Sequence, residues 1–261
     1  MKKVNYHTHT SLCRHADGTE RDYVNAALSA GLDVLGFSDH APFPDDRYDL
    51  RMDYAQLDPH LKTLDLLRRE FQDSLTILSG LEIEYSPDMF DYYRYLLHEK
   101  KLDYLLLGQH CFLSADHTPA NAFSIQGKNG TSLYVDYAHS IKEGLETGFF
   151  RVLAHPDVIF INDLDWDENC EKACEIIVEA AANTGTILEL NANGIRRNIR
   201  NYRDMIRYPY PHPKFWEKVS GTDLPVLINS DCHNPDCIWD SCMNRAYQLA
   251  LEWNLHLVDS L

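Results

Sequence analysis

The sequence predicts an α/β protein that forms a distorted, seven-stranded TIM-like barrel, (β/α)7, as a single domain over residues 1–261. Three observations predict this fold. Short apolar runs alternate with stretches of helical period, which favours parallel strands joined by helices. The apolar runs are nearly continuous, as is typical of strands buried on both faces, so a closed barrel is favoured over an open sheet. The length suits one barrel, and no low-complexity linker divides the chain.

Seven apolar runs are predicted as strands: Val4–Thr8, Val34–Ser38, Thr76–Leu81, Tyr104–Gly108, Phe149–Ala154, Thr186–Leu190 and Val226–Asn229. The clearest predicted helices between them are Glu20–Ala30, Leu57–Phe71, Ser132–Glu146 and Asn169–Thr184. Two connections, Pro42–Pro59 and Leu113–Thr131, are long and polar. Loops of this length are usually functional or disordered, so the second is expected to be either a substrate lid or a mobile loop.

The composition limits the classes of function. The formal charge of −16 argues against nucleic acid as a main partner, because binding to a phosphate backbone needs a basic surface. No run of 18 apolar residues predicts a membrane span, and the N-terminus lacks the apolar core of a signal peptide, so a cytoplasmic protein is expected. The seven cysteines are expected to be reduced thiols. A thiolate zinc site among Cys170, Cys174, Cys232, Cys237 and Cys242 is the less favoured alternative.

Polar residues, mostly of metal-ligand type, stand at the C-terminal end of every predicted strand. In a β/α barrel these ends converge on one face, where active sites lie. His7 and His9 are two residues apart and therefore share one face of their strand, as do Asp231 and His233. The histidines outside this pattern are interpreted as surface or core residues: His60, His98, His117, His139, His212 and His256.

Imidazole and carboxylate ligands without thiolate suit Zn, Mn or Fe. Nine residues are candidate metal ligands: His7, His9, His15, His40, Glu82, His110, His155, Asp231 and His233. A catalytic ion commonly takes about three protein ligands, so nine candidates suggest three divalent ions with one bridging carboxylate. Three ions with two carboxylates give a net charge of about +4, which would attract a phosphate dianion despite the acidic exterior.

The same residues resemble the polymerase and histidinol phosphatase (PHP) family over nearly the whole chain. The first motif of that family resembles His7-Thr8-His9 with His15 and Asp17-Gly18, and the second resembles Ser38-Asp39-His40-Ala41-Pro42-Phe43. The remaining motifs resemble Gly80-Leu81-Glu82, His110, His155-Pro156-Asp157 and Ser230-Asp231-Cys232-His233. The run from Asn191 to Arg197, followed by Tyr210-Pro211, is similar to the histidinol-phosphatase branch.

The resemblance implies a distorted seven-stranded barrel with three metal ions. It implies one ion on His7, His9, Glu82 and Asp231, a second on Glu82, His110 and His155, and a third on His15, His40 and His233. It also implies a small phosphorylated substrate, L-histidinol phosphate, which the enzyme would hydrolyse to L-histidinol and phosphate. Cys232, Gln109 and Cys111 depart from the usual residues of the family, and none of them is an expected ligand.

The expected mechanism is attack on phosphorus by a hydroxide that bridges two of the ions, because metal-bound water has a pKa lowered to roughly 7. Glu82, Asp231 and His233 are the expected catalytic residues, with Asp231 as the proton donor to the leaving alcohol and His233 as its alternative. Substrate contacts are expected from Arg196, Arg197 and His40. Arg196 has the alternative of a solvated surface arginine. Asp17 is expected to orient His15.

Three alternative functions differ from this one. A related phosphoesterase could act on a nucleotide or another small phosphoester, although a polymeric nucleic acid is disfavoured by the acidic charge. A non-catalytic binding module is disfavoured because the whole ligand set is present. A hydrolase of amide or ester bonds on a similar barrel would usually carry a lysine after a strand, and none of the predicted strands is followed by one.

Overall fold

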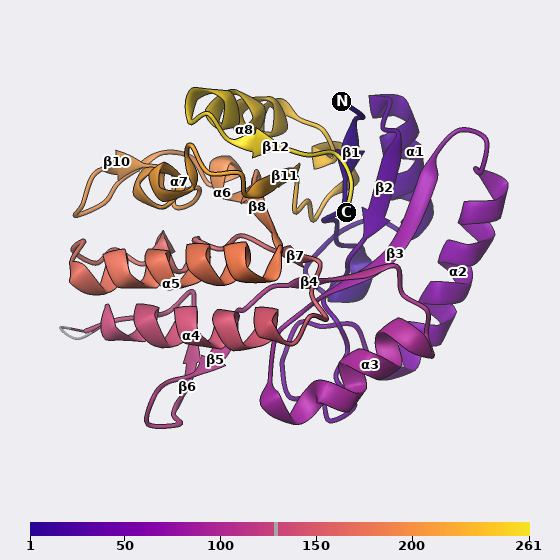
Figure 1. Cartoon of the computed structure of the whole chain (residues 1–261). Helices are drawn as coiled ribbons and strands as arrows, with labels where there is room; N and C mark the ends of the chain where they lie inside the picture. The colour runs from indigo at the N-terminus through magenta and orange to yellow at the C-terminus, as the bar shows by residue number, and fades with distance from the viewer. Residues whose placement is uncertain (128–129) are drawn as a thin grey trace.

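The computed structural model of the chain describes residues 1–127 and 130–261. One parallel sheet forms its centre, with the strand order β1-β2-β3-β4-β7-β8-β11-β12 (Figure 1). Its strands are β1 (Val4–Asn5), β2 (Val34–Phe37), β3 (Thr76–Ile83), β4 (Tyr104–Leu107), β7 (Val152–Leu153), β8 (Ile187–Asn191), β11 (Pro225–Asn229) and β12 (His256–Leu257). The sheet curls into an incomplete barrel, so the predicted TIM-like α/β fold is confirmed.

Helices connect these strands, as the alternation of patterns predicts. They are α1 (Glu20–Ala30), α2 (Leu57–Glu70), α3 (Phe90–His98), α4 (Ser132–Glu146), α5 (Glu168–Thr184), α6 (Asn193–Arg196), α7 (Pro213–Val219) and α8 (Ser241–Glu252). The 3-10 helices are Ser11–Cys13, Tyr54–Gln56, Pro87–Met89, Val158–Ile161 and Pro235–Cys237. The four helices predicted from the sequence begin and end within one residue of α1, α2, α4 and α5.

Two antiparallel hairpins lie outside the central sheet. They pair β5 (Cys111–Leu113) with β6 (Pro119–Asn121), and β9 (Arg200–Asn201) with β10 (Ile206–Arg207). The first hairpin occupies part of the connection predicted as a long loop, Leu113–Thr131, so that segment is partly regular rather than wholly irregular. Two residues of this connection, 128 and 129, lie outside the described residues.

The prediction of seven strands is corrected to eight in the central sheet. The additional strand, β12, is only two residues long and pairs with β11 at Pro225 and Val226. The segment after β12 also reaches β1, because Asp259 accepts hydrogen bonds from the Lys2 N–H (2.6 Å) and the Tyr6 hydroxyl (3.1 Å). The eighth strand therefore fills the edge between β11 and β1 at the end opposite the predicted site.

At the other end of the barrel, an isolated parallel bridge pairs Thr8 with Cys232. The His9 N–H donates to the Cys232 carbonyl across this seam at 3.0 Å. Strand β1 is shorter than predicted because side chains take over its hydrogen bonds: the Tyr6 N–H donates to Asn229 Oδ1 (2.8 Å) and the Thr8 N–H to Ser38 Oγ (3.1 Å). The chain near residues 5–9 is thus held against both neighbouring strands.

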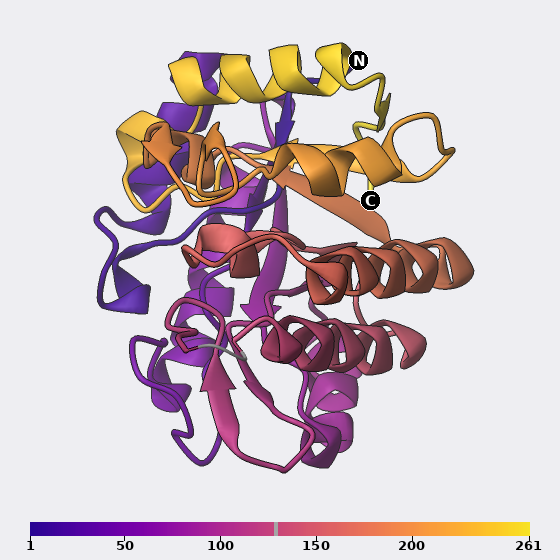
Figure 2. The same cartoon turned by 90° about the vertical axis from the view of Figure 1, so that its left-hand side faces the viewer.

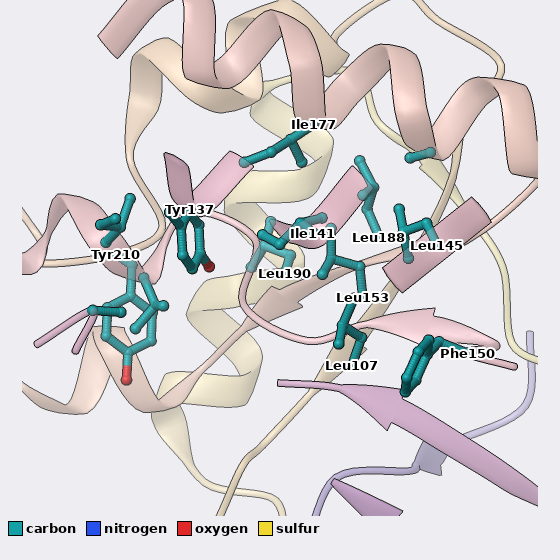
Figure 3. Packing of buried hydrophobic residues seen from close by; sticks show 14 of the residues in the cluster. Leu107, Tyr137, Ile141, Leu145, Phe150, Leu153, Ile177, Leu188, Leu190 and Tyr210 are labelled. Atoms are coloured by element: carbon teal, nitrogen blue, oxygen red, sulfur yellow. The ribbon is translucent and has the colours of Figure 1, made fainter. Parts of the chain in front are cut away.

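The main apolar core lies between the sheet and the outer helices. Ile141 and Leu145 of α4 and Ile177 of α5 pack toward Leu188 and Leu190 of β8 (Figure 3). Helices α4 and α5 lie side by side in both views of the whole chain (Figure 2). A second apolar cluster fills the barrel interior, where the buried ring of Tyr104 passes Gly36 and Gly80. A Cβ at Gly80 would lie 2.4 Å from that ring, so the glycine makes room for it. This interior layer is the floor beneath the site.

None of the helices in residues 1–127 and 130–261 has the length and hydropathy needed to cross a membrane.

Candidate metal centre

The candidate ligands gather at the C-terminal ends of the strands, around a cavity of about 770 Å³. Seven of the nine predicted ligands line this cavity: His15, His40, Glu82, His110, His155, Asp231 and His233. The other two, His7 and His9, are fully buried and contact Glu82 and Asp231. Residues that span positions 7 to 233 of the sequence therefore meet in one place, as their positions after strands predict.

Glu82 lies at the centre of the cluster, and its two oxygens face different histidines. Oε2 lies 3.4 Å from Nε2 of His7 and 3.4 Å from Nε2 of His9. Oε1 lies 2.8 Å from Nε2 of His155 and 3.4 Å from Nε2 of His110. A carboxylate placed in this way can serve two metal positions at once, one with each oxygen. Gly108 leaves space for it, since a Cβ there would lie 2.1 Å from Oε1.

Asp231 and the remaining histidines continue the cluster toward the cavity. Oδ1 of Asp231 lies 3.2 Å from Nε2 of His9 and 3.5 Å from Nδ1 of His233. Nε2 of His233 lies 3.0 Å from Nε2 of His15. Nδ1 of His40 lies 2.8 Å from Oε2 of Glu82. All nine predicted ligands thus belong to one contiguous group of nitrogen and oxygen donors.

The donor set fits divalent ions because several of its buried atoms lack hydrogen bonds. Nε2 of His7, Nε2 of His9, Nδ1 of His40 and Oε2 of Glu82 are buried without a hydrogen-bond partner. Although Nδ1 of His40 is only 2.8 Å from Oε2 of Glu82, the two atoms lack hydrogen-bond geometry. Buried polar atoms are normally satisfied, and metal coordination would satisfy these.

The second nitrogen of several ligand histidines is held by the protein. Nδ1 of His7 lies 2.8 Å from Oε1 of Glu189, and Nδ1 of His110 lies 3.0 Å from Oε1 of Glu84. Nδ1 of His15 donates to the Cys13 carbonyl at 2.7 Å. Such contacts fix the ring and its tautomer and leave Nε2 free for a metal, as is usual for metal-binding histidines.

The pKa values of most candidate ligands are shifted in the direction that favours cation binding. Burial raises the pKa of Glu82, but the nearby His110, His40 and His7 outweigh it and hold the pKa well below the usual range. The pKa of Asp231 is likewise lowered well below its usual range, despite burial, by the nearby His7 and His9. Burial lowers the pKa of His9 to about 3 and that of His40 well below its usual value. These groups therefore stand in the protonation states that metal binding requires.

His7 and His155 differ from these groups. Burial lowers the pKa of His155, but Glu82 raises it above the usual value. Burial also lowers the pKa of His7, but Glu189, Asp231 and Glu82 together raise it well above the usual value. A metal ion bound at Nε2 would therefore displace a proton from His7, and metal uptake would release that proton to solvent.

Two of the candidate ligands have left-handed backbone conformations that are uncommon outside glycine. The φ angle of His155 is 30° and that of Asp231 is 47°. Strained backbone of this kind persists where the surrounding structure fixes it, and it clusters at functional sites. Here it turns each side chain into the cavity directly after its strand.

Comparisons with known proteins agree with this geometry. Residues 5–193 match the PHP domain. The chain belongs to the PHP domain family. This match confirms the resemblance seen in the sequence motifs.

Several proteins similar to the chain are named as histidinol-phosphatases. A Deinococcus radiodurans protein named "Probable histidinol-phosphatase" is 29% identical over 234 residues, covering 88% of this chain and 85% of that protein. The histidinol-phosphatase of Bacillus subtilis is 24% identical, covering 89% of this chain and 94% of that protein. The crystal structure of a Lactococcus lactis histidinol phosphate phosphatase, complexed with zinc, L-histidinol and phosphate, superimposes with a TM-score of 0.71 at 17% identity. It covers 98% of this chain and 95% of that chain. The predicted enzyme class, a metal-dependent phosphoric monoester hydrolase similar to histidinol-phosphatases, is confirmed.

Among the residues expected to contact the substrate, His40 and Arg197 line the cavity, whereas Arg196 does not. The Arg196 guanidinium pairs with Asp240 (Nε to Oδ2, 2.7 Å) and donates to the carbonyls of Ser230 and Cys237. The expectation that Arg196 binds the substrate is therefore corrected. This arginine joins α6 to the loops after β11, and it already makes four hydrogen bonds there.

Two further expectations concern residues around the ligands. Asp17 was predicted to orient His15, but Nδ1 of His15 donates to the Cys13 carbonyl instead. The connection Leu113–Thr131, expected to be either a substrate lid or a mobile loop, contributes Asn121 and Phe123 to the cavity. The Phe123 ring stacks on His110 with centroids 5.6 Å apart. The lid function of this segment stays a prediction.

Two buried carboxylates beside the ligands, Glu189 and Glu84, were not predicted from the sequence. Glu189 is fully buried and contacts Nδ1 of His7 (2.8 Å), the His155 N–H (2.9 Å) and Nδ2 of Asn229 (2.8 Å). Glu84 contacts Nδ1 of His110. A signal for both was available, since Glu189 interrupts an apolar strand and Glu84 lies two residues after Glu82, directly beyond the end of β3.

Replacing Glu189 by glutamine should weaken metal binding by roughly 10- to 100-fold, the usual effect of losing a group that orients a metal ligand. The amide retains the size of the side chain but removes the negative charge beside His7. Competition with a chromophoric chelator measures the affinity. Glu179→Gln, on the exposed side of α5, is the matched control. Equal metal affinity in Glu189→Gln and Glu179→Gln would contradict this role.

Proposed function

We propose that the protein hydrolyses a small phosphate monoester, most specifically L-histidinol phosphate to L-histidinol and phosphate, with three divalent ions of Zn, Mn or Fe. The observation that carries this proposal is the position of Glu82, whose two oxygens face two separate groups of histidines beside an open cavity. The names of the relatives and the ligands of the Lactococcus lactis structure support the choice of substrate.

The proposed ion positions follow the distances between the donors. His7, His9, Glu82 and Asp231 would hold the first ion, and Glu82, His110 and His155 the second. His15, His40 and His233 would hold the third. The short distance from His15 to His233 supports this last group. His40 also lies next to Glu82, so it stands between the first and third positions.

When bound, the ions supply Lewis acidity and lower the pKa of water, so that hydroxide becomes available as the nucleophile near neutral pH. Asp231 is ionised in the resting protein, because neighbouring histidines lower its pKa. Its Oδ1 can accept the proton of the attacking water and deliver it to the alcohol oxygen as the bond between phosphorus and that oxygen breaks. His233, 3.5 Å away from Asp231, is the alternative donor.

The proposed function includes the size of the substrate, the domain organisation and the cellular location. The acidic charge of −16 supports a small substrate rather than a nucleic acid, since a polyanion would be repelled by the exterior. We propose that residues 1–261 act as one domain and that the protein works in the cytoplasm, where a soluble phosphorylated metabolite would be found.

A panel of phosphate monoesters tests the substrate. Phosphate release should be measured for L-histidinol phosphate, nucleoside monophosphates and sugar phosphates with the metal-loaded protein. We expect kcat/KM for L-histidinol phosphate to exceed that of the other esters by about 100-fold or more, as a site with polar contacts to its substrate can achieve. A flat profile, or a preference for nucleotides, would contradict the proposed substrate and leave the phosphatase class intact.

A further inference from the structure

Three arginines line the cavity beside the metal centre, and they differ in their ion pairing and in their exposure to solvent. Arg47 is paired with Asp45 and Asp88, at 2.7 Å in each case. Arg197 is exposed. Arg51 is mostly buried, with only 11% of its side chain exposed, and it comes from the long connection Pro42–Pro59. A buried arginine facing a cavity can act on a ligand more strongly than an exposed one, because solvent screens it less.

The segment that carries Arg51 is held in place on both sides. Arg47 ties one side to Asp88, and Asp53 ties the other to Arg14. Between them, the Met52 N–H donates to the His40 carbonyl at 3.3 Å, and the Met52 side chain is 1% exposed. The backbone of this segment is thus attached directly to a candidate metal ligand, so Arg51 has a defined position beside the centre.

Glu84 fixes the head of Arg51 but leaves donors unused. Nη2 of Arg51 pairs with Oε1 of Glu84, and the same oxygen lies 3.0 Å from Nδ1 of His110. Nε of Arg51 is buried without a hydrogen-bond partner. Guanidinium carries five N–H donors, and unpaired buried donors are rare in folded proteins. Nη1 has only two long contacts, with the carbonyls of Asp49 and Leu50 at 3.4 Å each. Arg51 lines the cavity, so its incompletely paired guanidinium can donate to a ligand bound there.

We propose that Arg51 binds the phosphoryl oxygens of the substrate beside the metal centre. This inference rests on the proposed function, because it requires a phosphorylated ligand in the cavity. The planar guanidinium matches the oxygens of a phosphate, and charge-assisted hydrogen bonds of this kind are strong. Glu84 holds Arg51 in position before the ligand arrives, so little side-chain entropy is lost on binding. Arg51 thus takes the substrate-binding role that the sequence analysis gave to Arg196.

Arg51 and Glu84 form a neutral ion pair, so removing Arg51 alone would leave the Glu84 carboxylate buried and without this partner. The variants must therefore separate the loss of the arginine from the effect of that carboxylate. Arg51→Lys keeps the charge but removes the fork of donors. The double variant Arg51→Met with Glu84→Gln removes both charges and leaves the net charge unchanged. Arg14→Met is the matched control, because it breaks an ion pair to the same segment at an arginine that does not line the cavity.

The experiment measures binding of inorganic phosphate by calorimetry, metal content by elemental analysis, and kcat and KM for L-histidinol phosphate. We expect both Arg51 variants to raise the dissociation constant of phosphate and the KM by roughly tenfold or more, the effect of one lost charge-assisted hydrogen bond. Metal content should be unchanged in Arg51→Lys. The double variant is measured at saturating metal, because Glu84→Gln also removes the partner of His110 Nδ1. Arg14→Met should bind phosphate like the unmodified protein.

Two results would overturn the proposal. One is phosphate binding by the double variant at the affinity of the unmodified protein. The other is a loss of metal from Arg51→Lys that accounts for its weaker phosphate binding, since Arg51 would then act only through His110. The calorimetric readout also separates this inference from the proposed function. Suppose that phosphate binding depends on Arg51 but the protein does not hydrolyse L-histidinol phosphate. The proposed substrate would then be rejected, and the phosphate-binding role of Arg51 would be retained.

Discussion

Replacing Glu82 by glutamine is expected to reduce the metal content from the proposed three ions per chain to about one. The two oxygens of Glu82 face separate histidine groups, so one substitution removes a ligand from two positions. Activity should fall by far more than roughly 100-fold, because even residues that merely orient a ligand account for 10- to 100-fold effects. Elemental analysis of the purified variant measures the stoichiometry, and phosphate release measures the activity.

The control for this variant is Glu70→Gln, which changes a half-exposed carboxylate of α2 that pairs with Arg21. It makes the same chemical change away from the cavity and should retain all the metal. A Glu82→Gln protein that keeps its full complement of ions would show that this carboxylate does not bridge. Circular dichroism confirms that the variant is folded before the metal count is interpreted.

Removal of metal by a chelator should abolish phosphatase activity and lower the thermal stability of the protein. Activity should return when Mn or Zn is added back. The stabilisation follows from linkage: an ion present at about 100 times its dissociation constant contributes about 2.7 kcal/mol. The buried atoms of His7, His9 and Glu82 that lack partners explain why the metal-free state is less favourable. Calorimetry with and without metal gives the change in the unfolding temperature.

Activity that persists after elemental analysis has shown complete removal of metal would exclude the proposed mechanism. If the metal-free protein has an unchanged unfolding temperature, the bound ions do not stabilise the fold. The buried donor atoms would then be satisfied without ions. The control for direct effects of the chelator is the metal-loaded protein, assayed in buffer that contains the same chelator and an excess of metal.

Much of the centre could be predicted from the sequence because its geometry follows from the strands. His7 and His9 follow β1, and Asp231 and His233 follow β11. The topology of the barrel therefore brings these four residues together. The predicted helices were accurate for a similar reason, since α1 and α5 are bounded by a Thr19 or Asp167 cap and by Gly31 or Gly185.

The rest depends on tertiary packing that no local pattern contains. Arg196 stands beside the motif Asn191–Arg197, but its side chain turns toward Asp240, which lies 44 residues later in the chain. Arg51 lies in an irregular segment, and its burial against Glu84 results from the path of that segment over the cavity. The strand β12 was missed because two residues carry no measurable alternation.

The seam between Thr8 and Cys232 gives the metal centre a second consequence. Strand pairing joins the two sides here by one isolated bridge, and side-chain hydrogen bonds between Asn5 and Ser230 add to it. His7 and His9 on one side lie beside Asp231 and His233 on the other. Ions that share these ligands would act as a removable cross-link closing a loop of more than 220 residues, the distance from His9 to Asp231. Closing so large a loop restricts the unfolded chain strongly. Metal supply would then set how readily the barrel opens along its N- and C-terminal strands, and so its exposure to proteolysis.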